Sequence, residues 1–323
     1  MRRRFAAMFC AVALLTSAAC GSDSGSQSTP GKRDDVKVGL ISILDVAPIY
    51  LGKEKGIFAK HDINLTLEPA EGGTETVPSV MSGNQQFGFS NVVTLLLAQE
   101  QGLPVKAVTN GTNSTGKDGA DFGALMVEQN SPIKSVRDLA GKKVAVNTFK
   151  NIVELAVRAS ALKAGIDPDS IEFVKLGFPE MPAALEDGRA DAVFVVEPFQ
   201  QIILSQGGRH LASSYVDTAP DLCVAMYFTS KKLIGENPDL VKRFTDAMNE
   251  SLAYADAHPD EVRNILPTYT KIPAEVIPKL VLPKWPKDIN EDSLKSVADL
   301  GKQEKILPGE PNLDELLPAP TNG

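Results

Sequence analysis

Polar, glycine and aromatic residues follow many of the short apolar runs in this chain, and they are the groups that could hold a small molecule. Hydroxyl, amide and carboxyl side chains hydrogen-bond, glycine lets the backbone approach a ligand closely, and phenylalanine stacks on rings. Each also has a structural alternative: a turn, a helix cap, core packing or a structural hydrogen bond. The candidates are Asp45, Gly73, Thr74, Ser90, Asn91, Thr148, Phe149, Phe178 and Glu197.

The side chains that catalysis or metal binding needs are scarce and scattered. Histidine occurs only at positions 61, 210 and 258, and no spacing of His, Cys and Asp is that of a metal site. The chain has neither a Gly-x-Ser-x-Gly turn nor a glycine-rich phosphate loop. Cys223 lies in the apolar run DLCVAMYF, where we expect it to pack as a small hydrophobic residue; a catalytic thiol is the alternative. We therefore predict no catalytic residue, no metal and no cofactor.

Apolar runs alternate with helix-like segments, which predicts the elements that position the candidates. Such alternation indicates βαβ units with parallel strands, and ligands of open α/β sheets bind beyond the carboxyl ends of the strands. Two such series, followed by a helical tail, predict a cleft between two sheets. Strands are expected at 36–44, 63–70, 86–90, 105–112, 122–127, 142–147, 171–176 and 191–196. Helices are expected at 47–60, 74–82, 92–101, 135–141, 152–164, 182–190, 199–206, 241–257, 261–269, 274–280 and 292–305.

The length and charge of the chain restrict its class. Its 323 residues suggest two domains, and 43% hydrophobic residues suffice for two cores. The formal net charge is −8, and the chain has no long run of basic residues. Because nucleic acid binding requires clustered Lys and Arg against phosphates, we expect no nucleic acid partner.

The N-terminus reads as a leader of a secreted lipoprotein. MRRRF is cationic, 5–15 is apolar but too short to span a bilayer, and Ser17-Ala18-Ala19-Cys20 resembles a bacterial lipobox, with Ser17 in place of the usual Leu. By that resemblance 1–19 is a signal peptide, Cys20 carries the lipid, and the Ser/Gly-rich 20–35 is a flexible tether. Ordinary signal cleavage nearby is the alternative. We expect the protein in the cell envelope, anchored by lipid to the outer face of the cytoplasmic membrane.

Four segments in order resemble the nitrate, sulfonate and thiamine-precursor binding proteins. They are VKVGLISILDVAPIYLGKEKGIFAKHDINLTL, EGGTETVPSVMSGNQQFGFSNVVTLLLAQEQGLPVKAV, SPIKSVRDLAGKKVAV and LEDGRADAVFVVEPF. His61-Asp62-Ile63 departs from the Gly-Leu or Gly-Ile usual in the first segment. The resemblance spans about 36–317 and implies a type II periplasmic-binding-protein fold, α/β with two doubly wound lobes and a ligand cleft between them. It further implies a discontinuous lobe 1, 36–121 plus 225–323, and a lobe 2 at 122–224.

The resemblance also implies the function. The chain would be the solute-binding lipoprotein of an ABC importer, a monomer that captures a small organic molecule and delivers it to a membrane permease with its ATPase. Family ligand contacts fall in the loops of Asp45, Gly73, Thr74, Ser90, Asn91, Thr148 and Glu197. A eukaryotic pyrimidine synthase shares the fold, but its CCCFC stretch is missing here, so we predict no enzyme. A ligand-sensing lipoprotein without transport remains an alternative.

The charges of the predicted cleft loops indicate the class of solute. These loops carry Asp45, Glu71, Glu75, Glu180 and Glu197 against only Lys117 and Lys150. Without an arginine, the loops offer no bidentate partner for a sulfonate or carboxylate, although helix N-termini also bind anions. We therefore expect a neutral or cationic heterocycle, such as a thiamine pyrimidine precursor; a sulfonate- or nitrate-type anion is the alternative.

Overall fold

The structure, a computed structural model, describes residues 33–318. The predicted signal peptide, Cys20 and most of the predicted tether lie outside these residues. Within 33–318 no helix combines the length and the apolar character that a membrane span needs.

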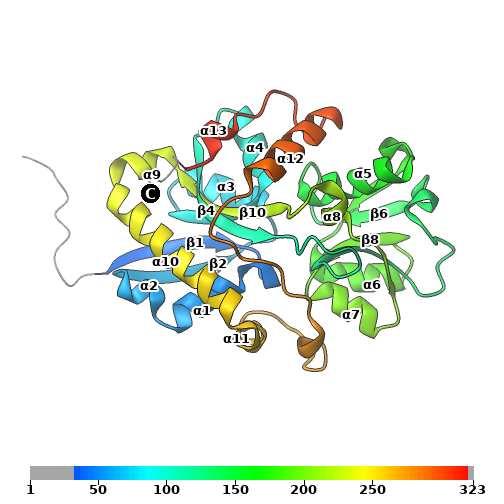
Figure 1. The fold of residues 1–323 in the computed structure, drawn as a ribbon, viewed down its shortest axis with the longest axis horizontal. Helices are drawn as coiled ribbons and strands as arrows, with labels where there is room; N and C mark the ends of the chain where they lie inside the picture. Colours follow the sequence, from blue (N-terminus) through cyan, green and yellow to red (C-terminus); the bar gives the residue numbers. More distant parts are fainter. Residues whose placement is uncertain (1–32, 319–323) are drawn as a thin grey trace, which may run out of the picture. The chain divides into compact units, whose positions relative to one another are not determined.

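The first of two five-stranded sheets is built from two distant parts of the chain (Figure 1). Its order is β2-β1-β3-β10-β4, with β1 parallel to both β2 and β3. Strand β10, the last in chain order, is antiparallel to its two neighbours, with Ala225 opposite Asn91 of β3 and Met226 opposite Asn110 of β4. The strands are β1 Asp34–Leu40, β2 Ile63–Pro69, β3 Phe87–Asn91, β4 Val105–Asn113 and β10 Cys223–Ser230.

The second sheet comes from the chain between β4 and β10. Its order is β7-β6-β8-β5-β9, and β6 is parallel to β7 and β8, whereas β5 is antiparallel to β8 and β9. Both sheets are therefore mixed, whereas we predicted parallel strands throughout. In each sheet the strand that arrives from the other sheet, β10 in the first and β5 in the second, runs antiparallel to its neighbours. The strands are β5 Gly123–Val127, β6 Lys143–Val146, β7 Glu172–Lys175, β8 Ala192–Val196 and β9 Arg209–Ala212.

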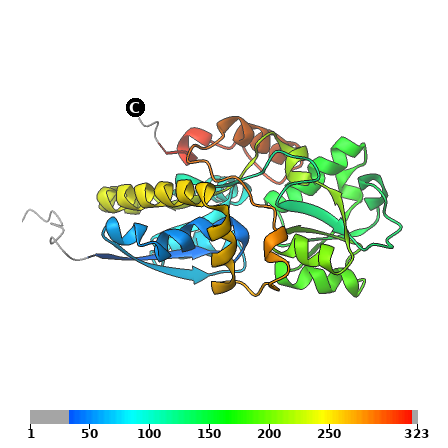
Figure 2. The same cartoon turned by 60° about the horizontal axis from the view of Figure 1, so that its bottom comes forward.

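Helices cover both faces of each sheet (Figures 1 and 2). Around the first sheet, α1, α2 and α10 pack together on one side and α3, α4, α12 and α13 lie on the other; around the second, α5 packs on α8 and α6 packs on α7. The helices are α1 Ala47–Glu54, α2 Ile57–Lys60, α3 Gly73–Met81, α4 Val92–Glu100, α5 Ile152–Ala164, α6 Met181–Glu186, α7 Phe199–Ser205, α8 Ser214–Thr218, α9 Lys231–Glu236, α10 Pro238–Ala257, α11 Pro259–Ile265, α12 Glu291–Gln303 and α13 Leu313–Leu316.

Helix α5 shows why the ends of some helices could be predicted from the sequence. Asn151 accepts hydrogen bonds from the backbone N–H groups of Val153 and Glu154, and Gly165 ends the helix with φ 75°. An amide cap at one end and a left-handed glycine at the other are the chemistry that starts and stops helices. The predicted range 152–164 is confirmed.

Several other predicted elements were wrong. The single helix predicted at 47–60 is α1 and α2, separated by Gly56 at φ 71°, a left-handed conformation that breaks the helix. The helix predicted at 274–280 is only a 3-10 turn at Ile277–Lys279, because Pro278 has no backbone N–H to donate to a longer helix. The predicted tether was two residues too long, since Asp34 and Asp35 pair with β2. Strands β9 and β10 and helices α8, α9 and α13 were not predicted.

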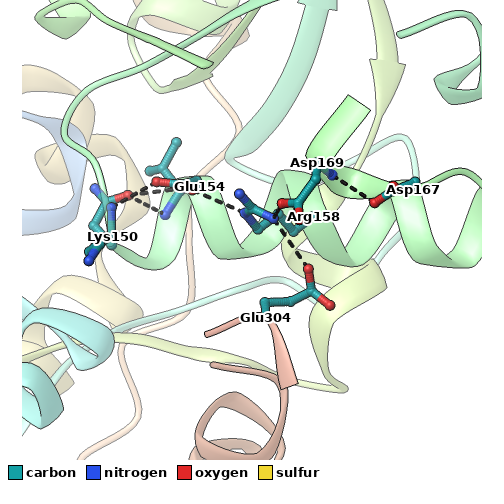
Figure 3. A network of polar contacts seen from close by, with 8 residues as sticks. Lys150, Glu154, Arg158, Asp167, Asp169 and Glu304 are labelled. Atoms are coloured by element: carbon teal, nitrogen blue, oxygen red, sulfur yellow. Dashed lines mark hydrogen bonds and ion pairs between the residues drawn. The ribbon is translucent and has the colours of Figure 1, made fainter. Parts of the chain in front are cut away.

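An arginine joins the helices of the two sheets (Figure 3). The guanidinium of Arg158 in α5 donates to Glu154 at 3.0 Å, to Asp169 at 2.8 Å and to Glu304, at the end of α12, at 3.3 Å. The Arg158 and Glu304 side chains are only 13% and 10% exposed. A partly buried charge network of this kind depends on each partner, because a carboxylate left alone there has lost its hydration.

Replacing this arginine should destabilise the protein. We expect Arg158→Met to lower the free energy of unfolding by about 2–4 kcal/mol, because Glu154 and Glu304 lose their shared cation. Urea denaturation at neutral pH measures the change. Lys232→Met, which removes an exposed lysine 3.9 Å from Glu236, is the control and should cost less than about 0.5 kcal/mol. Equal changes in the free energy of unfolding for the two substitutions would show that the Arg158 network does not stabilise the protein more than an exposed ion pair does.

Candidate functional site

A cavity of about 270 Å³ lies between loops of the two sheets, and we call it the outer cavity. The first sheet contributes the loops that follow β1 and β2, and the second contributes the loop that follows β7 and the start of α7. The cavity therefore lies beyond the carboxyl ends of parallel strands, where α/β sheets bind ligands. Its lining residues are Ile41, Ser42, Ile43, Ala70, Glu71, Gly177, Phe178, Pro179, Glu180 and Phe199.

A smaller cavity of about 30 Å³ adjoins the outer cavity, and we call it the inner chamber. The two cavities share Ile41, Ile43 and Phe178 as lining residues. The polar side chains of the inner chamber come from the 3-10 helix after β1, the end of β3, the loop after β6, the start of α5, and α8. They are Asp45, Asn91, Asn147, Asn151 and Tyr215, and the remaining wall is apolar.

Asp45 is the least satisfied of these polar groups. It lies in the 3-10 helix Leu44–Val46 and is 3% exposed. Its backbone oxygen accepts hydrogen bonds from Thr112 at 3.1 Å and from the indole N–H of Trp285 at 3.0 Å, which fix the loop. Its carboxyl Oδ2, in contrast, is buried without a hydrogen-bond partner among the described residues. Burial raises the pKa of this carboxyl from 3.8 to about 7.

The asparagines of the inner chamber connect the two sheets. Asn91 caps α4 through Thr94, and the same side-chain oxygen accepts a hydrogen bond from the backbone N–H of Ile152 in α5 at 3.3 Å. On the other side, Asn151 caps α5 and donates to Asn147 at 2.7 Å. These amides therefore have structural roles, as the alternative reading of Asn91 held, and they also line the chamber.

Glu197 is buried like Asp45, but backbone donors satisfy it. Its carboxyl oxygens accept hydrogen bonds from the N–H groups of Val281 and Gln201, each at 3.2 Å, and its backbone oxygen accepts from Leu44. Burial nevertheless raises the pKa of the Glu197 carboxyl to about 8. Glu197 lines neither cavity and links the end of β8 to the first sheet and to the C-terminal segment.

The structure brings three of the nine candidates to the cavities. Asp45 and Asn91 line the inner chamber, and Phe178 lines both cavities. Gly73 lies against Ser90, whose hydroxyl is where a side chain on Gly73 would have to be, while Thr148 is buried next to Gly72. Thr74 is exposed, and Phe149 is 50% exposed. Ligand contacts by Gly73, Thr74, Ser90, Thr148, Phe149 and Glu197 stay predictions.

Several lining residues were not among the candidates. Ile41, Ser42 and Ile43 were missed because the apolar run led us to extend the first strand to residue 44, whereas β1 ends at Leu40. A strand end at Leu40 would have selected them. Tyr215 was missed because α8 was not predicted, and Phe199 because we read it only as the start of a helix.

The ionisable residues that line the two cavities are all acidic. Asp45, Glu71 and Glu180 line them, and the lining residues include no lysine or arginine. In the part of the chain that the structure describes, no group of His, Cys, Asp and Glu has the arrangement of a metal site. Cys223 is fully buried and packs as a core residue, and this burial raises the pKa of its thiol to about 12, which favours the protonated form at neutral pH.

Comparison with known proteins identifies relatives over most of the chain. A family model described as NMT1/THI5 like matches residues 44–262. The chain is 25% identical over 227 residues to the 4-amino-5-hydroxymethyl-2-methylpyrimidine phosphate synthase of Candida albicans (strain WO-1), covering 66% of this chain and 64% of the synthase, just under two thirds of its length. It is 22% identical over 287 residues to the putative aliphatic sulfonates-binding protein of Bacillus subtilis (strain 168), covering 86% and 83%.

A solved structure establishes the fold. The crystal structure of the periplasmic aliphatic sulphonate binding protein of Escherichia coli matches with a TM-score of 0.71 at 20% sequence identity, covering 88% of this chain and 97% of that one. The predicted fold class, that of type II periplasmic binding proteins, is confirmed.

The two buried carboxyl groups should respond differently to neutralisation. An acid with a raised pKa in the folded state costs stability as pH rises from its unfolded pKa to its folded pKa, here from about 4 to about 7 for Asp45. We expect Asp45→Asn to remove this loss and to raise the free energy of unfolding at pH 8 by roughly 2–4 kcal/mol, with little change at pH 4.

Glu197→Gln is the comparison, measured by chemical denaturation at the same two pH values. We expect Glu197→Gln to raise the free energy of unfolding less than Asp45→Asn does, or to lower it. The amide nitrogen of glutamine cannot accept the hydrogen bond that one of the carboxyl oxygens accepts in Glu197. Equal gains at both positions would contradict the difference in hydrogen bonding.

Proposed function

Since the chain belongs to the NMT1/THI5-like family and has the fold of ABC-importer binding proteins, we propose that it is an extracytoplasmic solute-binding protein that captures a small organic molecule. The outer cavity carries this proposal. Loops of both sheets line it, so a molecule bound there contacts both sides at once. A ligand that touches two bodies favours the arrangement in which they are close together.

We propose two lobes, 36–121 plus 225–323 and 122–224, that close around the solute. The chain passes between the sheets after β4 and again before β10, and polar groups hold the first passage. Asp121 accepts hydrogen bonds from Ser114 at 2.7 Å and from the backbone N–H of Thr115 at 2.8 Å. A short connection between two rigid bodies is typical of a hinge.

The partners follow from the same proposal. The closed protein would deliver its solute to a membrane permease with its ATPase, as a monomer held at the outer face of the cytoplasmic membrane by a lipid on Cys20. A ligand-sensing lipoprotein without transport is the second candidate. Uptake of the solute by cells that lack this chain distinguishes the two: a transport component abolishes uptake when deleted, whereas a sensor leaves it intact.

We propose binding without catalysis, although one relative is named a synthase. That match is 25% identical and covers 64% of the synthase. The chain lacks the CCCFC stretch of such enzymes, and His61 is a surface residue paired with Glu250, away from both cavities. Incubation with candidate ligands and analysis of the products by mass spectrometry tests this point, and recovery of a converted product would contradict it.

The lining of the cavities supports a neutral or cationic heterocycle as the solute. Phe178 and Phe199 lie nearly parallel, with ring centroids 6.3 Å apart, and both line the outer cavity. Aromatic walls bind flat rings, and the acidic lining disfavours anions. The name of the Bacillus relative favours a sulfonate-type anion as the alternative, and helix N-termini could bind one.

A thermal-shift screen followed by calorimetry tests the solute class. We expect aminopyrimidines and similar small heterocycles to raise the melting temperature, because a ligand that binds only the folded state stabilises it. Phe178→Leu should weaken the affinity about tenfold through loss of ring contact. Phe173→Leu, in β7 and outside both cavities, is the matched control and should bind like the unchanged protein. Tight binding of alkanesulfonates without any response to heterocycles would overturn the proposed class.

A further inference from the structure

One partly buried ion pair joins the two proposed lobes at a place away from both cavities. Arg158 belongs to α5, a helix of the second sheet, whereas Glu304 ends α12, which packs on α4 beside the first sheet. The guanidinium donates to the Glu304 carboxylate at 3.3 Å, and neither residue lines a cavity. Because movement of one lobe away from the other would break this contact, the pair affects how readily the lobes separate.

Arg158 is held in place by its own lobe, independently of Glu304. It donates to Glu154 at 3.0 Å and to Asp169 at 2.8 Å, and its guanidinium lies 5.2 Å from the ring centroid of Phe173 in β7. A side chain that is already fixed loses little conformational freedom when it gains another partner. The guanidinium is therefore preorganised to receive Glu304 when the lobes come together.

The residue after Glu304 adds a second attraction between the lobes, in the opposite sense. Lys305 has a φ of 56°, a left-handed backbone conformation that is uncommon for a residue with a side chain. The hydrogen bond from Arg158 lowers the pKa of Asp169, and the positive charges of Arg158 and Lys305 lower it further. The end of α12 thus brings an anion to Arg158 and a cation towards Asp169, so the charges of the two lobes are complementary here.

The helix that carries Arg158 also positions part of the inner chamber. The second carboxyl oxygen of Glu154 accepts a hydrogen bond from the backbone N–H of Lys150 at 2.8 Å (Figure 3). The loop of Lys150 includes Asn147 and leads to the cap residue Asn151, and both asparagines line the inner chamber. The position of α5 relative to the first sheet therefore determines both the ion pair and the shape of the chamber.

We propose that Arg158 and Glu304 form a latch that keeps a measurable fraction of the protein closed before any solute binds. This inference rests on the two closing lobes of the proposed function and adds the element that sets their equilibrium. A solute that binds only the closed form has an apparent affinity proportional to the closed fraction. Because the latch touches neither cavity, it changes the affinity for every solute by the same factor.

Single-molecule fluorescence energy transfer on the full chain without solute measures the closed fraction. The two fluorophores are attached to azido amino acids that replace Lys53 in α1 and Arg189 after α6, both exposed and one in each lobe. We expect an open and a closed population in the otherwise unchanged protein. Glu304→Met should raise the open-to-closed ratio about 5- to 30-fold, because Arg158 keeps the carboxylates of its own lobe but loses its bond to α12.

Glu310→Met is the matched control. Glu310 lies in the same C-terminal segment and pairs with Lys302 of α12, so this exposed ion pair does not join the lobes. The substitution removes one carboxylate, as Glu304→Met does, and should change the open-to-closed ratio less than about twofold.

A second background should reverse the effect of Glu304→Met. In Arg158→Met, Glu304 faces Glu154 and Asp169 of the other lobe without a cation between them, and like charges repel. Adding Glu304→Met to Arg158→Met should therefore lower the open-to-closed ratio, although the same substitution alone raises it. A residue that only stabilises the fold would not produce this change of sign, and circular dichroism verifies that each variant is folded.

The outcomes separate the latch from the proposed function. If the unchanged protein is entirely open without solute, if Glu304→Met leaves the ratio unchanged, or if its effect has the same sign in both backgrounds, the latch is wrong while the binding function stands. If every variant shows one population at the distance found in this structure, the lobes do not move, and the proposed closure around a solute fails together with the latch.

Discussion

The return of the chain into the first sheet as β10 is the constraint on which the other features depend. β10 pairs with β3 on one side and β4 on the other, so the hydrogen bonds of two ladders fix its position. Everything between β4 and β10 must then form a second body, and the chain must pass between the bodies twice. As a result the loops after β1 and β2 face the loop after β7, and the outer cavity lies between them.

The two buried carboxyl groups between the sheets differ in their hydrogen-bond partners. Glu197 follows β8 and joins the second sheet to Leu44 and Val281 by backbone hydrogen bonds, so its burial is compensated. Asp45 follows Leu44 directly; Thr112 and Trp285 hold its backbone oxygen, and its Oδ2 has no hydrogen-bond partner among the described residues. Where a fixed loop presents a polar group to a cavity, binding orders no further groups, which is how preorganised contacts gain affinity.

The sequence predicted correctly those elements whose ends carry local capping signals. It did not predict the features that depend on contacts between distant parts of the chain. Asn151 and Gly165 bracket α5, so its range could be read directly, whereas the direction of β5 and β10 depends on tertiary pairing. The first strand was extended too far because Ile43 and Leu44 are apolar, yet both are buried outside any strand, after β1 has ended at Leu40. That error shifted the predicted site past Ile41–Ile43. Asp45, Asn91 and Phe178 were chosen because they follow predicted strands, and they line the cavities, but their contact with a ligand stays a prediction.

A crystal structure of the full chain with its tightest-binding heterocycle tests the central claim most directly. The account predicts the ring against Phe178 in the outer cavity, in contact with loops of both sheets. A ligand bound away from the outer cavity, or bound by residues of one sheet alone, would contradict it.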